Sequence, residues 1–356
     1  MASGFKSPST STKSSKALSI ANATALTEKM GVIFSQIEDP RVERTRVHLL
    51  QDILIIGILS VIAGGKGWED MENYGLSKYE WLEQFLSLPE GIPSPDTFRR
   101  EFERLSPKVF EQCFRQWIES IVECCGAQVI PIDGKTLKGS YDREQNKSAL
   151  HLVSAWSSKY RLVLGQVKVA DKSNEITAIP ALLELLDIAG CIITIDAMGT
   201  QTAIASQIFN QKADYVLALK GNHPTLHRQV KDWFEQQSLQ GFKGVIHSYD
   251  QRIEKGHHRT EKRQVWCIPI SQLPPLHNHS DWVGLKCVVM VVRVRHLWNK
   301  TTRDSLRGEA IVQFYLTSLD CDARKLAQAI RLHWGIENGL HWTLDVTFNE
   351  DTCRIR

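Results

Sequence analysis

The sequence predicts an α/β fold: a mixed β-sheet with helices on both faces, interrupted by a β-rich insertion and preceded by an all-helical domain. Three observations support this prediction. Apolar residues recur every three or four positions from residue 29 to 125, which is the period of amphipathic helices. From residue 128, short apolar runs typical of strands alternate with helical periods. From residue 239 to 310 the runs are strand-like and the helical period is lost.

The first 28 residues are rich in Ser, Thr, Ala and Lys and almost lack large apolar side chains. Such a segment buries too little apolar surface to offset the entropy of ordering, so we expect a disordered tail over 1–28. Residues 29–125 are expected to form a helical N-terminal domain that is a candidate for DNA binding. Within it, Ser94 caps a short basic helix. This helix either enters a DNA groove or presents an ordinary solvated face, because glutamates lie among its arginines.

The α/β core is expected to begin with residues 126–238. Its elements in order are strands at 129–132, 149–154 and 162–169, a helix at 175–186, a strand at 191–196, a helix at 200–209, a strand at 215–219 and a helix at 225–234. The first three strands are close enough in sequence to pair as an antiparallel meander. The later strands are separated by helices, which predicts right-handed crossovers. This is the element order of the ribonuclease H-like fold.

The rest of the chain is expected to contain the insertion and the return to the core. The insertion, 239–310, includes strand-like runs at 265–268 and 286–295. Residues 311–356 are expected to complete the core with a strand at 312–316 and a helix from Asp322 onward.

Bulk composition limits the classes of protein. A chain of 356 residues is long enough for two or three domains, and 42% hydrophobic with 23% charged residues is typical of globular proteins. The net charge of +3 is too small to indicate that the whole surface binds a polyanion. A surface that binds nucleic acid must therefore be local. The apolar run Ile53–Ala63 is too short to span a bilayer, and no secretory leader is apparent, so we expect no membrane segment and a cytoplasmic location. Eight cysteines without a Cys-x-x-Cys pair predict reduced thiols, mostly in the core, and no zinc pattern.

Two aspartates follow predicted strands. Asp133 follows the apolar run 129–132, and Asp196 ends the run 192–196. The carboxyl ends of strands are where α/β sheets place their ligands, and paired carboxylates suit a hard cation such as Mg²⁺. The alternatives are that Asp133 forms a turn with Gly134 and that Asp196 caps the next helix.

A glutamate completes the candidate site. Glu337 lies on a helix expected to return to the sheet, and its neighbours at three and four residues make one face partly apolar. The alternative is an ordinary surface glutamate. Two aspartates and one glutamate are the minimum set for two metal ions about 3.5 to 4 Å apart, the usual arrangement for in-line displacement at phosphorus.

Several motifs occur together in one order along the chain. They are Ile132-Asp133-Gly134-Lys135 with Lys138-Gly139, Lys172-Ser173-Asn174-Glu175-Ile176, Thr194-Ile195-Asp196-Ala197-Met198, the run 215–222, the run 255–259, the run 333–338, His341-Trp342 and Leu344-Asp345-Val346. Through these motifs the chain resembles the DDE transposases of bacterial insertion sequences, most closely the branch of the H-repeat-associated proteins.

The resemblance implies a reaction and its participants. It implies that Asp133, Asp196 and Glu337 are catalytic ligands of two Mg²⁺ ions, for which Mn²⁺ could substitute. Water would cut at the element end, and the released 3′-hydroxyl would attack target DNA. The implied partners are terminal inverted repeats and target DNA, with a homodimer or larger assembly on DNA. Relatives look as though they continue past Arg356, so reduced activity of this copy is also an expectation.

Seven basic residues are candidate DNA contacts because they lie near predicted strand ends, near the ligands or in the basic segment 251–263. They are Lys135, Lys138, Lys220, Lys255, Arg259, Arg263 and Arg331. For the segment 251–263 the alternative is a solvated hairpin tip.

Two other functions stay open from the sequence. One is a ribonuclease H-like nuclease or resolvase that cuts DNA without joining it. The other is a DNA-binding remnant in which the catalytic domain is inert and the helical N-terminal region still binds.

Overall fold

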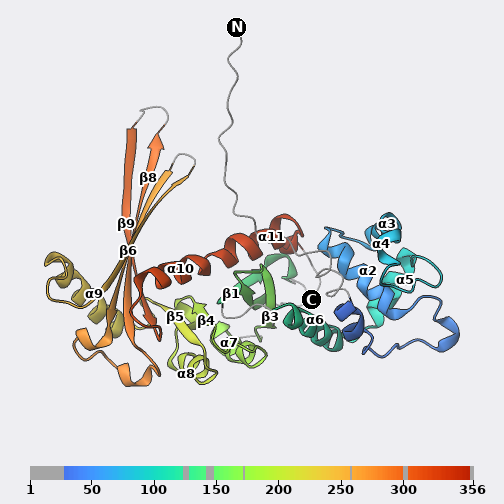
Figure 1. The fold of residues 1–356 in the computed structure, drawn as a ribbon, viewed down its shortest axis with the longest axis horizontal. Coiled ribbons are helices and arrows are strands. Elements are labelled where there is room, and N and C mark those ends of the chain that lie inside the picture. The colour runs from blue at the N-terminus through green and yellow to red at the C-terminus, as the bar shows by residue number, and fades with distance from the viewer. Residues whose placement is uncertain are drawn as a thin grey trace, which may run out of the picture. The chain divides into compact units, whose positions relative to one another are not determined.

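The computed structural model describes residues 28–122, 128–141, 148–170, 173–256, 259–299 and 304–352. The chain divides into two compact units, Met1–Cys124 and Cys125–Arg356 (Figure 1). Apart from Glu28, the tail expected over 1–28 lies outside the described residues.

The first unit is helical over its described residues. Its elements are a 3-10 turn at Glu43–Thr45 and the helices α2 (Leu50–Ile62), α3 (Trp68–Ser77), α4 (Tyr79–Leu82), α5 (Pro95–Arg104) and α6 (Pro107–Val122). The apolar α2 is buried from Ile53 to Ile56, as its sequence predicts for a core helix. No helix in the described ranges is long and apolar enough to cross a membrane.

The basic helix α5 begins as predicted. The side chain of Ser94 accepts a hydrogen bond from the backbone N–H of Thr97 at 3.3 Å, which satisfies one of the free donors of the first turn. Arg99 pairs on the same helix with Asp96 at 2.7 Å and with Glu103 at 3.2 Å. The charge of Arg99 is therefore balanced locally.

The second unit is built on one mixed sheet of described strands. They are β1 (Val129–Leu137), β2 (Leu150–Ser157), β3 (Leu162–Lys168), β4 (Ile192–Ile195), β5 (Asp214–Leu219), β6 (Ser248–Gly256), β7 (Arg259–Pro269), β8 (Cys287–Asn299) and β9 (Asp304–Thr317). Their order across the sheet is β3-β2-β1-β4-β5-β9-β8-β7-β6. The chain is therefore a mixed α/β protein, as the sequence predicts.

The first five strands pair as the sequence predicts. β2 pairs antiparallel with both β1 and β3, which confirms the meander. β4 pairs parallel with β1 and with β5, and Ile132 on β1 lies opposite Ile195 on β4. The parallel strands bring the residues that follow Ile132 and Ile195 to the same edge of this part of the sheet.

The four long strands β6 to β9 form an antiparallel meander that extends the same sheet. The connection runs through β9, since Leu219 on β5 lies opposite Phe314 on β9. The strand expected at 312–316 begins earlier, at Asp304, so the expected domain boundary at residue 310 falls within β9.

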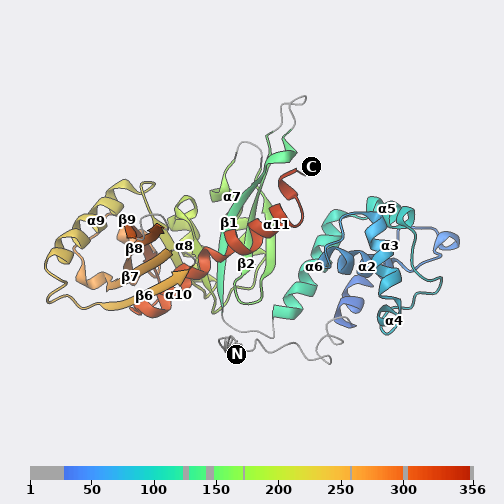
Figure 2. The ribbon, with the colours of Figure 1, turned by 90° about the horizontal axis from the view of Figure 1, so that it is seen from above.

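Helices lie on both sides of the first strands (Figure 1). α7 (Glu175–Glu184) contacts β2 and β3, α8 (Thr202–Asn210) contacts β5, and α9 (Pro224–Leu239) contacts β9. On the other side, α10 (Ala323–His333) runs across the sheet and contacts β1, β4, β5, β6 and β7 (Figure 2). Its apolar face shares a buried core with β5, β7, β8 and β9, so α10 joins the two parts of the sheet.

Candidate active site

Asp133 lies within β1, at the point where the parallel pairing with β4 ends. The last parallel pair is Ile132 with Ile195, but β1 continues antiparallel to β2, with Gly134 opposite Val153. The expectation that the strand ends at residue 132 was therefore wrong, and so was the alternative that Asp133 and Gly134 form a turn. Pairing with β2 keeps the backbone extended after β4 has ended, and this fixes Asp133 on a rigid element.

Asp196 directly follows β4 and is held by two hydrogen bonds. Its Oδ1 accepts the backbone N–H of Ala197 at 2.6 Å and the Lys220 ammonium at 2.8 Å. Burial opposes ionisation, but these two donors hold the pKa of Asp196 below its usual value. Asp196 is thus ionised, and it also caps the short 3-10 turn Ala197–Gly199. The alternative that Asp196 caps the next helix was wrong, because that helix, Thr202–Asn210, begins after Gln201.

Asp133 sits among other acidic groups. Burial, together with the negative charges of Glu175, Glu337 and Asp196, raises the pKa of Asp133 to about 7, against the lowering effect of the Gly134 backbone N–H. Four carboxylates from distant parts of the sequence therefore lie close enough to interact electrostatically.

Glu337 begins a short π-helical segment, Glu337–His341, that continues from α10. Two glycines let this segment approach the sheet closely: a Cβ atom on either Gly335 or Gly339 would lie 2.9 Å from the Trp156 ring on β2. On the same segment, His341 Nδ1 lies 3.8 Å from Asp133 Oδ2. The Glu337 side chain itself is exposed.

The donor set fits a hard divalent cation. Clustered carboxylate oxygens are the ligands that Mg²⁺ prefers, and the repulsion that adds to burial in raising the pKa of Asp133 is what a bound cation would relieve. Within the described ranges, Asp133, Asp196 and Glu337 do not offer oxygens that all lie within 4.8 Å of one another. Ligands of two ions about 3.5 to 4 Å apart do not need that spacing. Asp196, moreover, is turned toward Lys220.

Glu175 is a further acidic residue of this site, beyond the three carboxylates that the sequence predicts. It begins α7, and its Oε1 lies 2.8 Å from His151 Nε2, while His151 Nδ1 lies 2.7 Å from Thr136 Oγ1. Glu175 reaches β1 only because residue 134 is glycine, since a Cβ there would collide with the Glu175 carboxylate. The sequence signal for Glu175 was its place in one of the motifs that carry the family resemblance. No short-range pattern indicates that α7 points to β1.

His333 connects α10 to β4. Its Nδ1 lies 3.0 Å from Thr194 Oγ1, and burial lowers the pKa of His333 to about 4. The charge of Lys220 also lowers this pKa, while Asp196 raises it. His333 is therefore neutral at pH 7, and the neutral ring fixes the start of the segment that carries Glu337.

We expect His333 to take about 3 kcal/mol from the free energy of unfolding as the pH is lowered from 6.5 to 4, while the raised pKa of Asp133 acts in the opposite direction. The sign follows because the unfolded chain takes up a proton on His333 over this range and the folded chain does not. Urea unfolding across these pH values measures the effect. In His333→Gln, which cannot titrate, the fall should be smaller by this amount. If the free energy of unfolding depended on pH in the same way in the wild type and in His333→Gln, His333 would not be the titrating group.

Lys135 forms ion pairs with acidic residues of the C-terminal segment. Its side chain is 9% exposed, and its ammonium lies 2.7 Å from Asp345, 3.0 Å from Glu350 and 3.3 Å from Asp351. Lys138, which is 79% exposed, pairs with Asp351 at 2.9 Å. Both lysines were expected to contact DNA, and in this structure the charge of Lys135 is neutralised by the protein itself.

Lys135→Met is expected to lower the free energy of unfolding by about 2 kcal/mol, because it leaves three carboxylates together without their cation. The loss is below that of a fully buried pair, since these carboxylates are 21% to 37% exposed. Lys138→Met is the control and should cost less than about 1 kcal/mol. Urea unfolding measures both, and equal losses would show that Lys135 has no special structural role.

The other candidate DNA contacts lie in different surroundings. Lys220 is 47% exposed beside Asp196, and Arg331 pairs with Glu254 at 3.0 Å. Lys255 is exposed near the end of β6. Arg259 begins β7, but its side chain lies outside the description, as do His257 and His258. Arg263 is 11% exposed and pairs with Glu261.

Arginines gather on neighbouring strands of the long meander. Arg263 on β7 lies opposite Arg293 on β8, and Glu261 lies opposite Arg295, which donates to Glu261 at 2.9 Å. Burial lowers the pKa of Arg293, and the charges of Arg295 and Arg263 lower it further. Arg293 Nε is buried without a hydrogen-bond partner in the described structure. One glutamate thus faces three arginines, which leaves positive charge available for an anion.

Comparison with known proteins identifies the relatives of this chain. Residues 125–356 match the family model described as a transposase DDE domain, and residues 32–118 match the model described as DDE_Tnp_1-associated. The protein named "Putative transposase YncI" of Escherichia coli O157:H7 is 41% identical over 324 residues, 90% of this chain and 80% of that protein. The "H repeat-associated putative transposase YhhI" of Escherichia coli (strain K12) is 41% identical over 310 residues, 87% of this chain and 80% of that protein.

A distant likeness to a solved structure also exists. The chain aligns with the cryo-EM structure of a piggyBac transposase synaptic complex with hairpin DNA, at a TM-score of 0.38 and 11% identity, over 90% of this chain and 66% of that one, just under two thirds. A likeness this remote supports no argument about the site.

Proposed function

Because the chain belongs to the family of proteins with a transposase DDE domain, we propose that it cuts the ends of insertion-sequence DNA and joins them to target DNA. Both steps are in-line displacements at phosphorus that need divalent cations. The observation that supports this proposal most is the parallel pairing of Ile132 with Ile195, which brings Asp133 and Asp196 to one edge of the sheet. The charge of Glu337 also acts on the pKa of Asp133 there. We also propose that β1 to β5 form a ribonuclease H-like core, and the order of these strands in the sheet supports this.

In this proposal Asp133, Asp196 and Glu337 hold two Mg²⁺ ions, and Mn²⁺ can substitute. Bound there, the ions would make the attacking hydroxyl or water more acidic and neutralise charge on the phosphate. Lys220 and the Ala197 N–H keep Asp196 ionised. Glu175 is a positioning residue that adds negative charge beside Asp133. Pairing with β2 and β4 holds Asp133 in place, and the close packing of Gly335 and Gly339 on Trp156 holds Glu337.

DNA is proposed to contact the basic residues whose charge is not fully neutralised by the protein. The best supported are the arginines of β7 and β8, Arg263, Arg293 and Arg295, together with exposed Lys138 and Lys255. Phosphate contacts of this kind give salt-dependent affinity without reading sequence. Lys220, Arg259 and Arg331 stay candidates, and Lys135 acts on DNA only if its acidic partners move away. Joining two element ends would require at least a dimer.

A strand-transfer assay tests the proposed reaction. The substrate is a duplex that ends in the inverted repeat flanking the coding region, already cut to expose its 3′-hydroxyl, mixed with supercoiled target DNA and Mg²⁺. We expect covalently joined product. Hydrolysis without joining would indicate a nuclease instead, and DNA binding without either reaction would indicate a DNA-binding remnant.

A further inference from the structure

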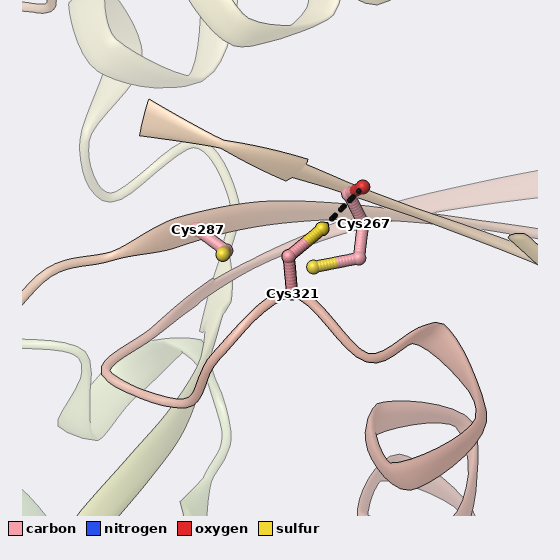
Figure 3. A group of neighbouring side chains, drawn as sticks. All are labelled: Cys267, Cys287 and Cys321. Atoms are coloured by element: carbon pink, nitrogen blue, oxygen red, sulfur yellow. Dashed lines mark hydrogen bonds between the residues drawn. The ribbon is translucent and has the colours of Figure 1, made fainter. Parts of the chain in front are cut away.

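Three cysteines that lie far apart in the sequence meet in the second unit. They are Cys267 on β7, Cys287 at the start of β8 and Cys321 in the turn before α10, and their sulfur atoms all lie within 4.8 Å of one another (Figure 3). Cys267 and Cys287 are 0% and 2% exposed. The Cys321 thiol is partly exposed and donates a hydrogen bond to the Cys267 carbonyl at 3.2 Å.

The sheet register explains why the two strand cysteines share a face. Cys267 lies opposite Val289, and Cys287 lies opposite Pro269, so the two cysteines are diagonal neighbours on one side of the β7–β8 pair. That side packs against α10, and Figure 3 shows Cys321 projecting from its turn toward the two strands. The register and the approach of this turn therefore bring three thiols together without any short-range cysteine motif.

The chemistry of three thiols differs from that of the carboxylate site. Thiolate sulfur is a soft ligand that favours Zn²⁺ or Cu⁺ and disfavours Mg²⁺. Zn–S bonds of about 2.3 Å place the sulfurs of a tetrahedral site roughly 3.8 Å apart. Small rotations of these side chains would reach that spacing from the observed one.

Charge favours zinc over copper at this place. Three thiolates with Zn²⁺ carry one net negative charge, whereas with Cu⁺ they carry two, and charge in an apolar core is costly. Lys286, next to Cys287, pairs with Asp320 at 2.8 Å, so this pair leaves the net charge around the thiols unchanged. Among the described residues, no fourth His, Cys, Asp or Glu offers an atom within the same 4.8 Å limit, so water reaching the partly exposed Cys321 side would complete the coordination.

We propose that Cys267, Cys287 and Cys321 bind one zinc ion that ties the β7–β8 pair to the start of α10. Binding deprotonates the three thiols, and the protons pass to solvent. The Cys321 S–H hydrogen bond to the Cys267 carbonyl is given up in exchange for the metal bond. Since α10 leads to Glu337, this ion would stabilise the helix on which the proposed catalytic glutamate depends.

The test is zinc binding by the full chain. The protein is stripped of metal under reducing conditions, given Zn²⁺ in the presence of excess Mg²⁺ and separated from free metal, and its zinc content is then measured by mass spectrometry. We expect one zinc per chain. Cys321→Ser, at the least buried of the three positions, should weaken zinc binding at least about 100-fold, since even outer-shell changes cost 10- to 100-fold.

Controls separate this site from other thiols and from the carboxylates. Cys191→Ser changes a buried cysteine outside the group and should keep the bound zinc. Asp133→Asn should keep it too. So should the double variant Cys124→Ser/Cys125→Ser, in which both cysteines lie outside the described residues. Binding of Co²⁺ to the wild type should give the intense near-ultraviolet absorption of thiolate ligation. Equal zinc in wild type and Cys321→Ser, or loss of zinc in the Cys191 or Cys124/Cys125 variants, would overturn the proposal. If Cys321→Ser does not fold, absence of the cobalt band in wild type overturns it equally.

Discussion

Asp196→Asn is expected to reduce Mg²⁺-dependent DNA cleavage at least about 10³-fold, because it removes a charged ligand whose metal contributes several kcal/mol of transition-state stabilisation. The change keeps the size of the side chain and its contact with the Ala197 N–H, so the fold should persist. Cleavage of an end-labelled element duplex measures the rate, and a gel-shift assay measures DNA binding, which should stay within a few-fold.

A matched control supports the interpretation of that variant. Asp232→Asn changes an exposed aspartate on α9 and should leave cleavage unchanged. Asp196→Asn also frees the Lys220 ammonium, so Lys220→Met is needed to separate the two effects: loss of the lysine should cost less than loss of the carboxylate. Cleavage by Asp196→Asn at the wild-type rate would remove this carboxylate from the mechanism.

Gly134→Ala is expected to reduce cleavage about 10²-fold, which is the scale of a displacement of roughly 1 Å at a reacting centre. A Cβ at this position would collide with the Glu175 carboxylate and would lie 2.6 Å from His151 Nε2. Glu175 and the neighbouring Asp133 must then shift. Single-turnover cleavage measures the loss, and thermal unfolding shows whether the fold is kept.

Two further variants separate strain from function. Gly221→Ala is the matched glycine control, because a Cβ there meets nothing within 4 Å, and it should cleave normally. Adding Glu175→Ala to Gly134→Ala removes the collision with the carboxylate and releases the His151 ring from its partner, so that the ring can move away from the new Cβ. The double variant should therefore recover part of the stability but not full activity if Glu175 positions Asp133. Full recovery of activity would mean that Glu175 matters only as an obstacle, and normal cleavage by Gly134→Ala would mean that the close approach is unimportant.

The sequence predicted the sheet well where the signal is local. Apolar runs separated by helical periods identified each strand from β1 to β5, and the lengths of the connections predicted which pairs are antiparallel and which parallel. The end of β1 was missed because Gly134 and Lys135 do not have the composition of a strand, and only pairing with β2 keeps them extended.

The candidate site was predictable for the aspartates and less so for the groups around them. The predicted neighbourhood of the strands at 129–132 and 191–196 was enough to pair Asp133 with Asp196, because the parallel pairing of β1 with β4 ends just before these two residues. Contacts between distant segments leave no such pattern. Three such contacts depend on tertiary packing: the ion pair of Lys135 with Asp345, the close packing of Glu175 on Gly134, and the proximity of Cys267 and Cys321. The cysteines show this most clearly, because their spacing predicts no metal site and the register of β7 and β8 brings them together.

The most direct test of the central claim is anomalous diffraction from crystals of the protein with DNA and Mn²⁺. We predict two manganese peaks about 3.5 to 4 Å apart, within bonding distance of carboxylate oxygens of Asp133, Asp196 and Glu337. Manganese bound elsewhere on the second unit, with these three side chains uncoordinated, would contradict the account.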